Sequence, residues 1–183
     1  SILENAANSS LLTSGGTISL LAGNTTKGST SVGTLADAIN TQGGTLTATA
    51  GTGGIYIDEA DTATISTVAV TGATGDIKIQ NGAAGNLTTT GAISTQGGNI
   101  TLSSFSNLGI GANVTVSAST GTISLTSDSD ANDTGSFAQT AGTISTNNGT
   151  IAITNKGTGD LKLGAITDTG GQGITITNEK GSI

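Results

Sequence analysis

Residues 93–104 read Ile93-Ser94-Thr95-Gln96-Gly97-Gly98-Asn99-Ile100-Thr101-Leu102-Ser103-Ser104. Similar phrases, with similar turn residues, recur along the chain. Related phrases begin at Ile39 upstream and at Ile144 downstream. A looser copy begins at Ile166, and its interval from Ile144 is less than half of that between Ile93 and Ile144. The longer intervals therefore contain two shorter turns. A recurrence of this kind predicts an array of structural repeats.

The phrases share a local pattern in which a Gly- or Asn-containing turn is followed by a short strand of alternating character, as in Gly16-Thr17-Ile18-Ser19-Leu20. Alternation with period two is typical of a half-buried strand. We interpret the Gly and Asn residues at the corners as the source of the positive φ angles that sharp turns need. The absence of proline agrees with a backbone that donates hydrogen bonds to its neighbours throughout.

The spacing of the strands predicts their topology. Isoleucines at nearly constant spacing, with one longer interval, head successive strand phrases: Ile77, Ile100, Ile123, Ile151 and Ile174. A coil of about 23 residues with Ile over Ile predicts an all-β, single-stranded parallel β-helix. Seven or eight coils stacked at about 4.8 Å would make a rod roughly 35 to 40 Å long. The alternative is an antiparallel β-sandwich, which also has closely spaced turns but calls for no recurrence of this length.

The domain prediction is a single β-helix segment over residues 1–183. Residues 1–15 are expected to form a strand and turn that lead into the coil, and residues 22–38 an irregular loop or short helical insertion. A chain that begins at Ser1 and contains no methionine is expected to be a piece of a longer protein.

Composition narrows the classes of function. The 183 residues include 30 Gly but no Pro, Cys, Met, Trp or His, and the formal charge is −7. Leu, Ile, Val and Phe make up about a fifth of the chain, which suits a narrow core column shared by stacked repeats. The lack of Cys excludes disulfides and thiolate metal sites. The negative charge disfavours nucleic acid, and no stretch approaches the roughly 20 apolar residues of a membrane span.

Three phrases carry a resemblance to a known family: Gly97-Gly98-Asn99-Ile100-Thr101-Leu102, Gly121-Thr122-Ile123-Ser124-Leu125 and Gly75-Asp76-Ile77-Lys78-Ile79. Over roughly residues 40–178 the chain resembles the shaft repeats of filamentous-haemagglutinin-type exoproteins, large adhesins that Gram-negative bacteria export by two-partner secretion. The resemblance implies a right-handed parallel β-helix outside the cell or on its surface. It implies a structural shaft for display and attachment, with a host or cell-surface glycan or protein as partner.

Two acidic segments are candidate calcium sites. Asp128, Asp130 and Asp133 have the spacing of a calcium loop, but the positions where an EF-hand needs Gly and Glu hold Asp133 and Gln139. We therefore expect a solvated insertion there, and the same holds for Asp58-Glu59-Ala60-Asp61. The segment Gly170-Gly171-Gln172-Gly173 begins like a calcium-binding nonapeptide repeat, but Thr175 stands where that repeat has Asp. The prediction is no metal site and no cofactor.

An enzyme is not expected. Polysaccharide-cleaving β-helices need clustered carboxylates or a basic residue on one face, and the sequence shows no such cluster. Lys78 and Lys162 are expected to point outward for solubility.

Modification and binding remain open from the sequence. Glycosylation sequons begin at Asn8, Asn24, Asn86, Asn99, Asn113, Asn132 and Asn148. One alternative function is an ice-binding solenoid, because threonines recur in rows at Thr45-Leu46-Thr47-Ala48-Thr49, Thr88-Thr89-Thr90 and Thr175-Ile176-Thr177. A calcium-dependent binding solenoid is the other alternative. The open sheet edges at the two ends predict end-to-end stacking on neighbouring segments or copies.

Overall fold

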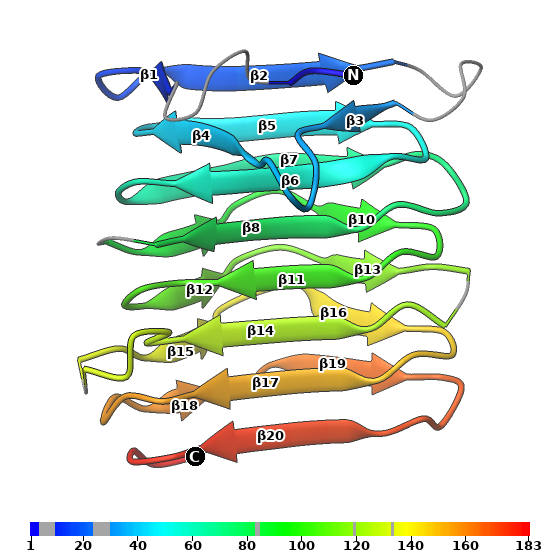
Figure 1. The fold of residues 1–183 in the computed structure, drawn as a ribbon. Helices are drawn as coiled ribbons and strands as arrows, with labels where there is room; N and C mark the ends of the chain where they lie inside the picture. Colours follow the sequence, from blue (N-terminus) through cyan, green and yellow to red (C-terminus); the bar gives the residue numbers. More distant parts are fainter. Residues whose placement is uncertain (4–9, 24–29, 83–84, 119, 133) are drawn as a thin grey trace.

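A computed structural model describes residues 1–3, 10–23, 30–82, 85–118, 120–132 and 134–183. In these residues every strand pairing is parallel and no helix occurs. In Figure 1 the strands β6, β8, β11, β14, β17 and β20 run leftward across the front, β10, β13, β16 and β19 run rightward behind them, and the chain descends from N to C. This path is a right-handed parallel β-helix. The predicted fold is confirmed, and the antiparallel sandwich is wrong.

One sheet, called sheet A, forms the front of the coil. Its strands are β1 (Leu11–Leu12), β3 (Ser31–Val32), β4 (Ile39–Gln42), β6 (Gly54–Glu59), β8 (Ile77–Asn81), β11 (Ile100–Ser103), β14 (Ile123–Ser127), β17 (Ile151–Asn155) and β20 (Ile174–Asn178). They stack in the order β1-β4-β6-β8-β11-β14-β17-β20, with β3 beside β4 on β6. The described chain therefore has eight levels, in agreement with the predicted seven or eight coils.

The second sheet, called sheet B, divides along the chain. Its strands are β2 (Thr17–Ala22), β5 (Thr45–Ala50), β7 (Ala63–Val70), β9 (Leu87–Thr89), β10 (Ile93–Thr95), β12 (Leu108–Ile110), β13 (Val114–Val116), β15 (Phe137–Gln139), β16 (Thr143–Thr146), β18 (Leu161–Lys162) and β19 (Ala165–Asp168). The first half of β7 pairs with β9 and the second half with β10. From this point each coil has two short strands opposite sheet A.

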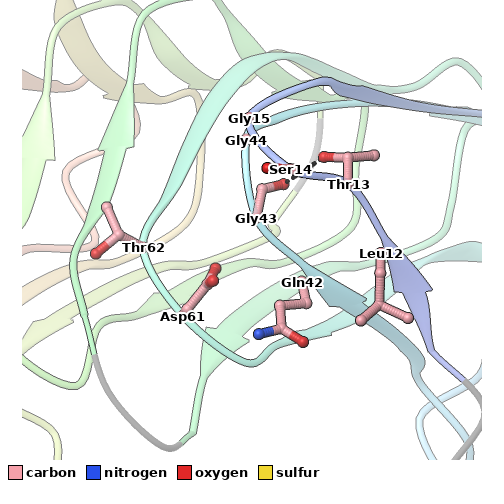
Figure 2. A pocket seen from close by; sticks show the side chains of 9 residues that line it. All are labelled: Leu12, Thr13, Ser14, Gly15, Gln42, Gly43, Gly44, Asp61 and Thr62. Carbon is pink, nitrogen blue, oxygen red and sulfur yellow. Dashed lines mark hydrogen bonds between the residues drawn. The ribbon is translucent and has the colours of Figure 1, made fainter.

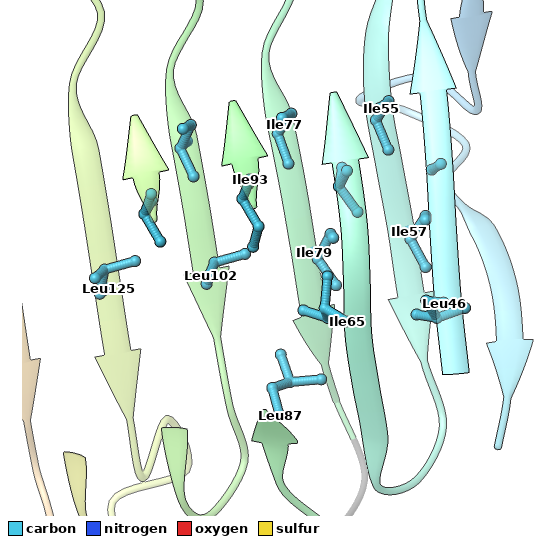
Figure 3. Packing of buried hydrophobic residues seen from close by; sticks show 14 of the residues in the cluster. Leu46, Ile55, Ile57, Ile65, Ile77, Ile79, Leu87, Ile93, Leu102 and Leu125 are labelled. Atoms are coloured by element: carbon cyan, nitrogen blue, oxygen red, sulfur yellow. The ribbon is translucent and has the colours of Figure 1, made fainter. Parts of the chain in front are cut away.

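The core consists of in-register columns of apolar side chains. Ile100 pairs with Ile77 on one side and with Ile123 on the other, and the column continues through Ile151 to Ile174. Ile77, Ile100 and Ile151 are fully buried, and Ile123 is 1% exposed. Figure 3 shows two such columns on β6 and β8, with Ile55 beside Ile77 and Ile57 beside Ile79. The register predicted from the spacing of the isoleucines is confirmed.

The copies of the repeated phrase do not all begin in the same sheet. Ile93, Ile144 and Ile166 belong to one column, with Val114 between the first two. The interval from Ile93 to Ile144 is therefore two coils, and that from Ile144 to Ile166 is one. Ile39 instead lies in sheet A, where it pairs with Ile57, so its inclusion in the same repeat was wrong. The reason is the local backbone conformation. The two glycines after Gln42 have positive φ angles of 91° and 73°, whereas Gly97 and Gly98 do not. The first pair connects sheet A to sheet B and the second pair connects sheet B to sheet A, although the two sequences are similar.

Asparagine has a different role from the expected one. The described non-glycine residues with positive φ are Asp128 and Ala131, so the proposal that Asn supplies this conformation was wrong. Asn99 and Asn113 instead precede strands, and their side-chain oxygens accept backbone N–H groups one coil later, from Thr122 at 2.9 Å and from Thr143 at 2.9 Å.

Glycine is required at one corner by close approach of neighbouring coils. Gly98, Gly121 and Gly149 precede strands of sheet A by two residues. A Cβ on any of them would overlap the backbone carbonyl oxygen of the glycine one coil earlier, which is Gly75 for Gly98. Such a contact excludes any side chain at these positions.

Polar side chains continue the core columns where sheet A ends. Thr41 pairs with Glu59 and Glu59 with Asn81, and lower in the coil Ser127 pairs with Asn155 and Asn155 with Asn178. The Asn155 Nδ2 donates to Asn178 Oδ1 at 2.9 Å, and Ser127 Oγ donates to Asn155 Oδ1 at 2.8 Å. The buried Thr41, Ser127 and Asn155 thus each donate a hydrogen bond to a side chain of the next level, and burial requires such partners.

Both the expected entry segment, 1–15, and the segment expected to be an irregular loop or short helical insertion, 22–38, contain short strands. Within 1–15, Ile2 forms a parallel bridge with Val32, and β1 pairs with β4. Within 22–38, β3 is followed by a non-helical turn in which Thr34 and Asp37 exchange backbone hydrogen bonds of 2.8 and 3.2 Å. Residues 4–9 and 24–29 lie outside the described part.

Candidate functional site

The segment from Asp58 to Asp61 places its three carboxylates in three environments. Asp58 is half-buried on the outer surface of sheet A, whereas Glu59, the next residue of the strand, points inward and is 1% exposed. Asp61 lies at the following corner, where its Oδ1 is buried without a hydrogen-bond partner. Strand alternation thus separates residues that are adjacent in sequence. Within the described residues, no three Asp or Glu side chains are grouped so that they could hold a metal ion.

Glu59 is held by donors from the preceding coil. Its carboxylate accepts the Thr41 hydroxyl at 2.7 Å and the Gly43 N–H at 2.9 Å. Burial raises the pKa of Glu59, the hydrogen bonds from Thr41 and Gly43 act against this, and the Asp61 carboxyl adds to the rise. The structure therefore favours the protonated acid more than water does.

A pocket of about 530 Å³ opens beside this corner, between the first three levels of the coil. Figure 2 shows it between Leu12, Thr13, Ser14 and Gly15, the corner Gln42-Gly43-Gly44, and Asp61 and Thr62. Asp61 is the acidic residue of the lining. Glycoside cleavage uses two carboxylates that flank the substrate, and Glu59, the nearest second one, is buried beneath the surface. Among its lining residues the pocket therefore presents one carboxylate, that of Asp61, rather than a pair.

In the insertion after β14, the two described acidic residues lie in different environments. Asp128 is fully buried in a left-handed conformation with φ 55°, whereas Asp130 is exposed. The Asp130 carboxylate accepts the Asn132 amide at 2.6 Å, and the Asn132 side-chain oxygen accepts the Thr134 N–H at 3.1 Å. Asp133 lies outside the described residues. The described part of the loop is thus organised by its own hydrogen bonds.

The glycine-rich turn before β20 is organised by Asp168. Its carboxylate accepts the N–H groups of Gly173 at 2.7 Å and Gly170 at 3.1 Å. These bonds, with the Gly173 bond as the largest contribution, lower the pKa of Asp168. A carboxylate at the end of β19 therefore shapes the turn.

The remaining candidates are spread over the surface. Lys78 points outward from sheet A and Lys162 from sheet B, so the two do not meet. Among the sequon asparagines, Asn86, Asn99 and Asn113 accept backbone N–H groups of the next coil, and Asn148 is exposed. Asn8 and Asn24 lie outside the described residues.

Threonines form a partial array on sheet B. Thr17, Thr45, Thr64 and Thr88 follow one another in register across four strands, and Ser19, Thr47 and Thr67 form a second column beside them. The array is interrupted, because β7 carries a bulge and the first column continues to Gly109 and Ala138. The other threonine stretches differ: Thr89 is buried, and Thr175 and Thr177 lie on sheet A. The three stretches noted in the sequence do not share one face.

A second hollow lies on the outer surface of sheet A, beneath the loop between β3 and β4. It is a cavity of about 140 Å³ between Thr34, Leu35, Ala36 and Ala38 on the loop and Tyr56, Ile57, Asp58, Lys78 and Gln80 on the sheet. Sequence reasoning missed it because the loop's position depends on strand pairing. The inward position of Glu59 was predictable, because Ile55, Ile57 and Glu59 are alternate residues of one strand and therefore point to the same face.

No protein-family model, curated protein or solved structure matches this chain in comparison. Also, the described residues contain no helix that is long and apolar enough to cross a membrane.

Proposed function

We propose that this chain is a structural shaft segment of a secreted bacterial surface adhesin or extracellular filament, which holds attachment functions away from the cell. The observation that carries the proposal is the continuous parallel stacking of eight levels in sheet A, in which apolar columns and side-chain hydrogen bonds connect successive coils. Such a solenoid is extended by adding coils, because each repeat contacts its neighbours alone. A scaffold of this kind needs no chemistry of its own.

The carboxyl-terminal end of the coil is an open edge. Ile174 is 42% exposed, although Ile151 and Ile123 in the same column are buried, and Leu163 is 37% exposed. In β8, β11, β14 and β17 the isoleucine that begins the strand donates its N–H to a carbonyl oxygen of the next level, as Ile151 does to the Gly173 oxygen at 3.1 Å. Ile174 occupies the same register, so its N–H points to the open edge.

The occupant that we propose for this edge is the amino-terminal coil of a second copy. That end also exposes apolar residues, with Leu11 42% and Leu12 65% exposed in β1. Strand polarity is the same at both ends, so head-to-tail contact would continue the parallel sheets. A heterologous contact of this type produces open fibres when it does not close.

Analytical ultracentrifugation at rising concentration tests the proposal with Ile174→Pro. Proline removes the outward N–H but no hydrogen bond within the coil, so we expect loss of assembly with little change in the unfolding midpoint. Ile174→Ala is the matched control, because it keeps the donor and trims the side chain. A wild-type chain that stays monomeric at every concentration would contradict end-to-end assembly.

The threonine array on sheet B favours ice binding as a second candidate. Parallel strands place its hydroxyl and methyl groups about 4.8 Å apart between coils and about 6.6 Å apart along a strand. The strands β2 and β5 keep this lattice in register, and the bulge in β7 interrupts it. Measurement of thermal hysteresis on the wild type and Thr47→Tyr tests it. Hysteresis that the tyrosine abolishes would favour this candidate, and its absence in the wild type would remove it.

A further inference from the structure

The outer surface of sheet A changes its chemistry at the cavity beneath the β3–β4 loop. Its outward positions on β6 and β8 hold a block of four side chains in which Tyr56 pairs with Lys78 and Asp58 with Gln80. On the four later strands the same columns carry small residues: Thr101, Ser103, Ser124, Thr126, Ala152, Thr154, Thr175 and Thr177. Large polar groups therefore gather where the cavity lies.

The loop that forms the other wall is fixed by strand register. Val32 pairs with Ile55 and Ile39 pairs with Ile57, so residues 33–38 stand opposite the single residue Tyr56 and must leave the sheet. In Figure 1 this loop descends across the front of β6. Gly33 allows the turn, because its φ is +65° and a Cβ would lie 2.6 Å from the Tyr56 carbonyl oxygen. The Asp37 N–H also donates to the Thr34 hydroxyl at 3.0 Å. The wall is thus preformed.

The polar groups of the cavity are available to a ligand. Within the described residues, no hydrogen bond or ion pair engages the side chains of Asp58, Lys78 or Gln80. Register places Asp58 and Lys78 on diagonal positions of adjacent strands, with Cα atoms about 8 Å apart from the usual strand spacings. Burial, and then the charge of Asp76, raise the pKa of Tyr56, so the phenol is neutral and both donates and accepts hydrogen bonds.

We infer that this cavity, bounded by Tyr56, Asp58, Lys78 and Gln80 under the loop 33–38, binds one neutral sugar unit of a glycan. A sugar presents hydroxyl groups, which the carboxylate, ammonium, amide and phenol would bind, and an apolar C–H face, which suits the tyrosine ring and the exposed Leu35. The inference rests on the proposed function for its setting, because a shaft outside the cell meets glycans.

The charges of the site select against other ligands. An anionic sugar would meet Lys78 but also Asp58 and a chain of net charge −7, and a cation would meet Lys78. An extended peptide binds best by adding a strand to a free sheet edge, whereas β6 and β8 are paired on both sides. The cavity, of about 140 Å³, is small, so a single sugar unit rather than a longer saccharide is the expected occupant.

Saturation-transfer NMR on the full chain tests the inference. The probes are the methyl glycosides of glucose, galactose and mannose, N-acetylglucosamine, anionic N-acetylneuraminic acid and a neutral tripeptide. We expect at least one neutral sugar to bind with a Kd of about 1 mM, as for small polar ligands. Tyr56→Ala and Asp58→Asn should each weaken binding about tenfold or more, whereas Tyr56→Phe should keep part of it.

The matched control is Ser124→Ala, which changes the same column three coils after Tyr56. Circular dichroism verifies the fold of each variant. Lack of binding by every neutral sugar, binding by the anionic sugar or the tripeptide alone, or full binding by Tyr56→Ala would overturn the inference. These outcomes are separate from assembly: a chain that binds sugar but never forms rods would contradict the shaft, and rods without sugar binding would contradict the site.

Discussion

The side-chain oxygen of Asn107 accepts two hydrogen bonds from Ser136, which lies one coil later and 29 residues further along the chain: one from its N–H at 3.0 Å and one from its hydroxyl at 2.7 Å. The Asn107 N–H in turn donates to Asn86 Oδ1 at 3.0 Å. A corner where strand pairing stops thus keeps its hydrogen bonds through a ladder of side chains. The ladder fixes the height of each coil relative to the next.

Asn107→Ala should lower the free energy of unfolding by about 0.5–1.5 kcal/mol, because it removes the acceptor of two hydrogen bonds from Ser136 at an exposed corner. Urea unfolding followed by circular dichroism measures the change. Asn148→Ala, at an exposed corner asparagine, is the matched control and should change stability by less than about 0.5 kcal/mol. Equal effects of the two variants would show that the ladder contributes nothing to stability.

Gly121→Ala should destabilise the coil by about 2–4 kcal/mol or prevent folding, because the new Cβ would overlap the Gly98 carbonyl oxygen. Gly82→Ala is the control: a Cβ there meets nothing within 4 Å and its φ is not positive. Thermal unfolding of both variants tests the difference. A stable, native-like Gly121→Ala would mean that the coils are further apart than described.

Phe137→Ala should cost about 3–5 kcal/mol, the usual range for removing a fully buried phenylalanine. The residue lies in register between Leu108 and Leu161 and fills the coil just after the insertion loop. Phe105 is half-buried, so Phe105→Ala should cost clearly less. Denaturant unfolding of the pair checks the order, and a reversed order would contradict the core.

Glu59 should make stability depend on pH. Because burial raises the pKa of Glu59 in the folded chain above its ordinary value of 4.5, the folded chain binds more protons than the unfolded chain between these two values. The stabilising contribution is therefore complete below about pH 4.5 and is lost as the pH rises through the folded pKa. Glu59→Gln should remove this loss, so that its stability relative to wild type grows from pH 4 to pH 8. Parallel pH profiles would contradict the assignment.

The register of sheet A was predictable because its isoleucines recur at nearly constant spacing. From Ile77 to Ile151, each of them also follows a corner glycine by two residues. Ile123 and Ile151 pair in register despite the longer interval between them, since the insertion is taken up in the loop after β14. The prediction succeeded because an insertion at a corner leaves the column above and below it unchanged. A one-residue shift would have reversed the burial of every side chain.

Other features of the fold depend on which of the two sheets a segment joins. A short stretch of sequence does not determine this. The phrase at Ile39 resembles that at Ile93, but the two lie in different sheets. The cavity beside Tyr56 exists because β3 and β4 pair with one strand, a long-range relationship without a local signal. Glu59 was predictable from strand parity, but the acidic cluster around it pointed to a surface loop.

We propose that stacked coils alone, without a bound ion, make an extended scaffold. Light scattering with negative-stain imaging of the purified chain at rising concentration, in calcium and in chelator, measures whether they do. We expect rods or end-to-end fibres that are the same in both conditions. Compact monomers that become ordered in calcium alone would contradict it and would point to the loop from Asp128 to Asp133 as a metal-dependent binding site.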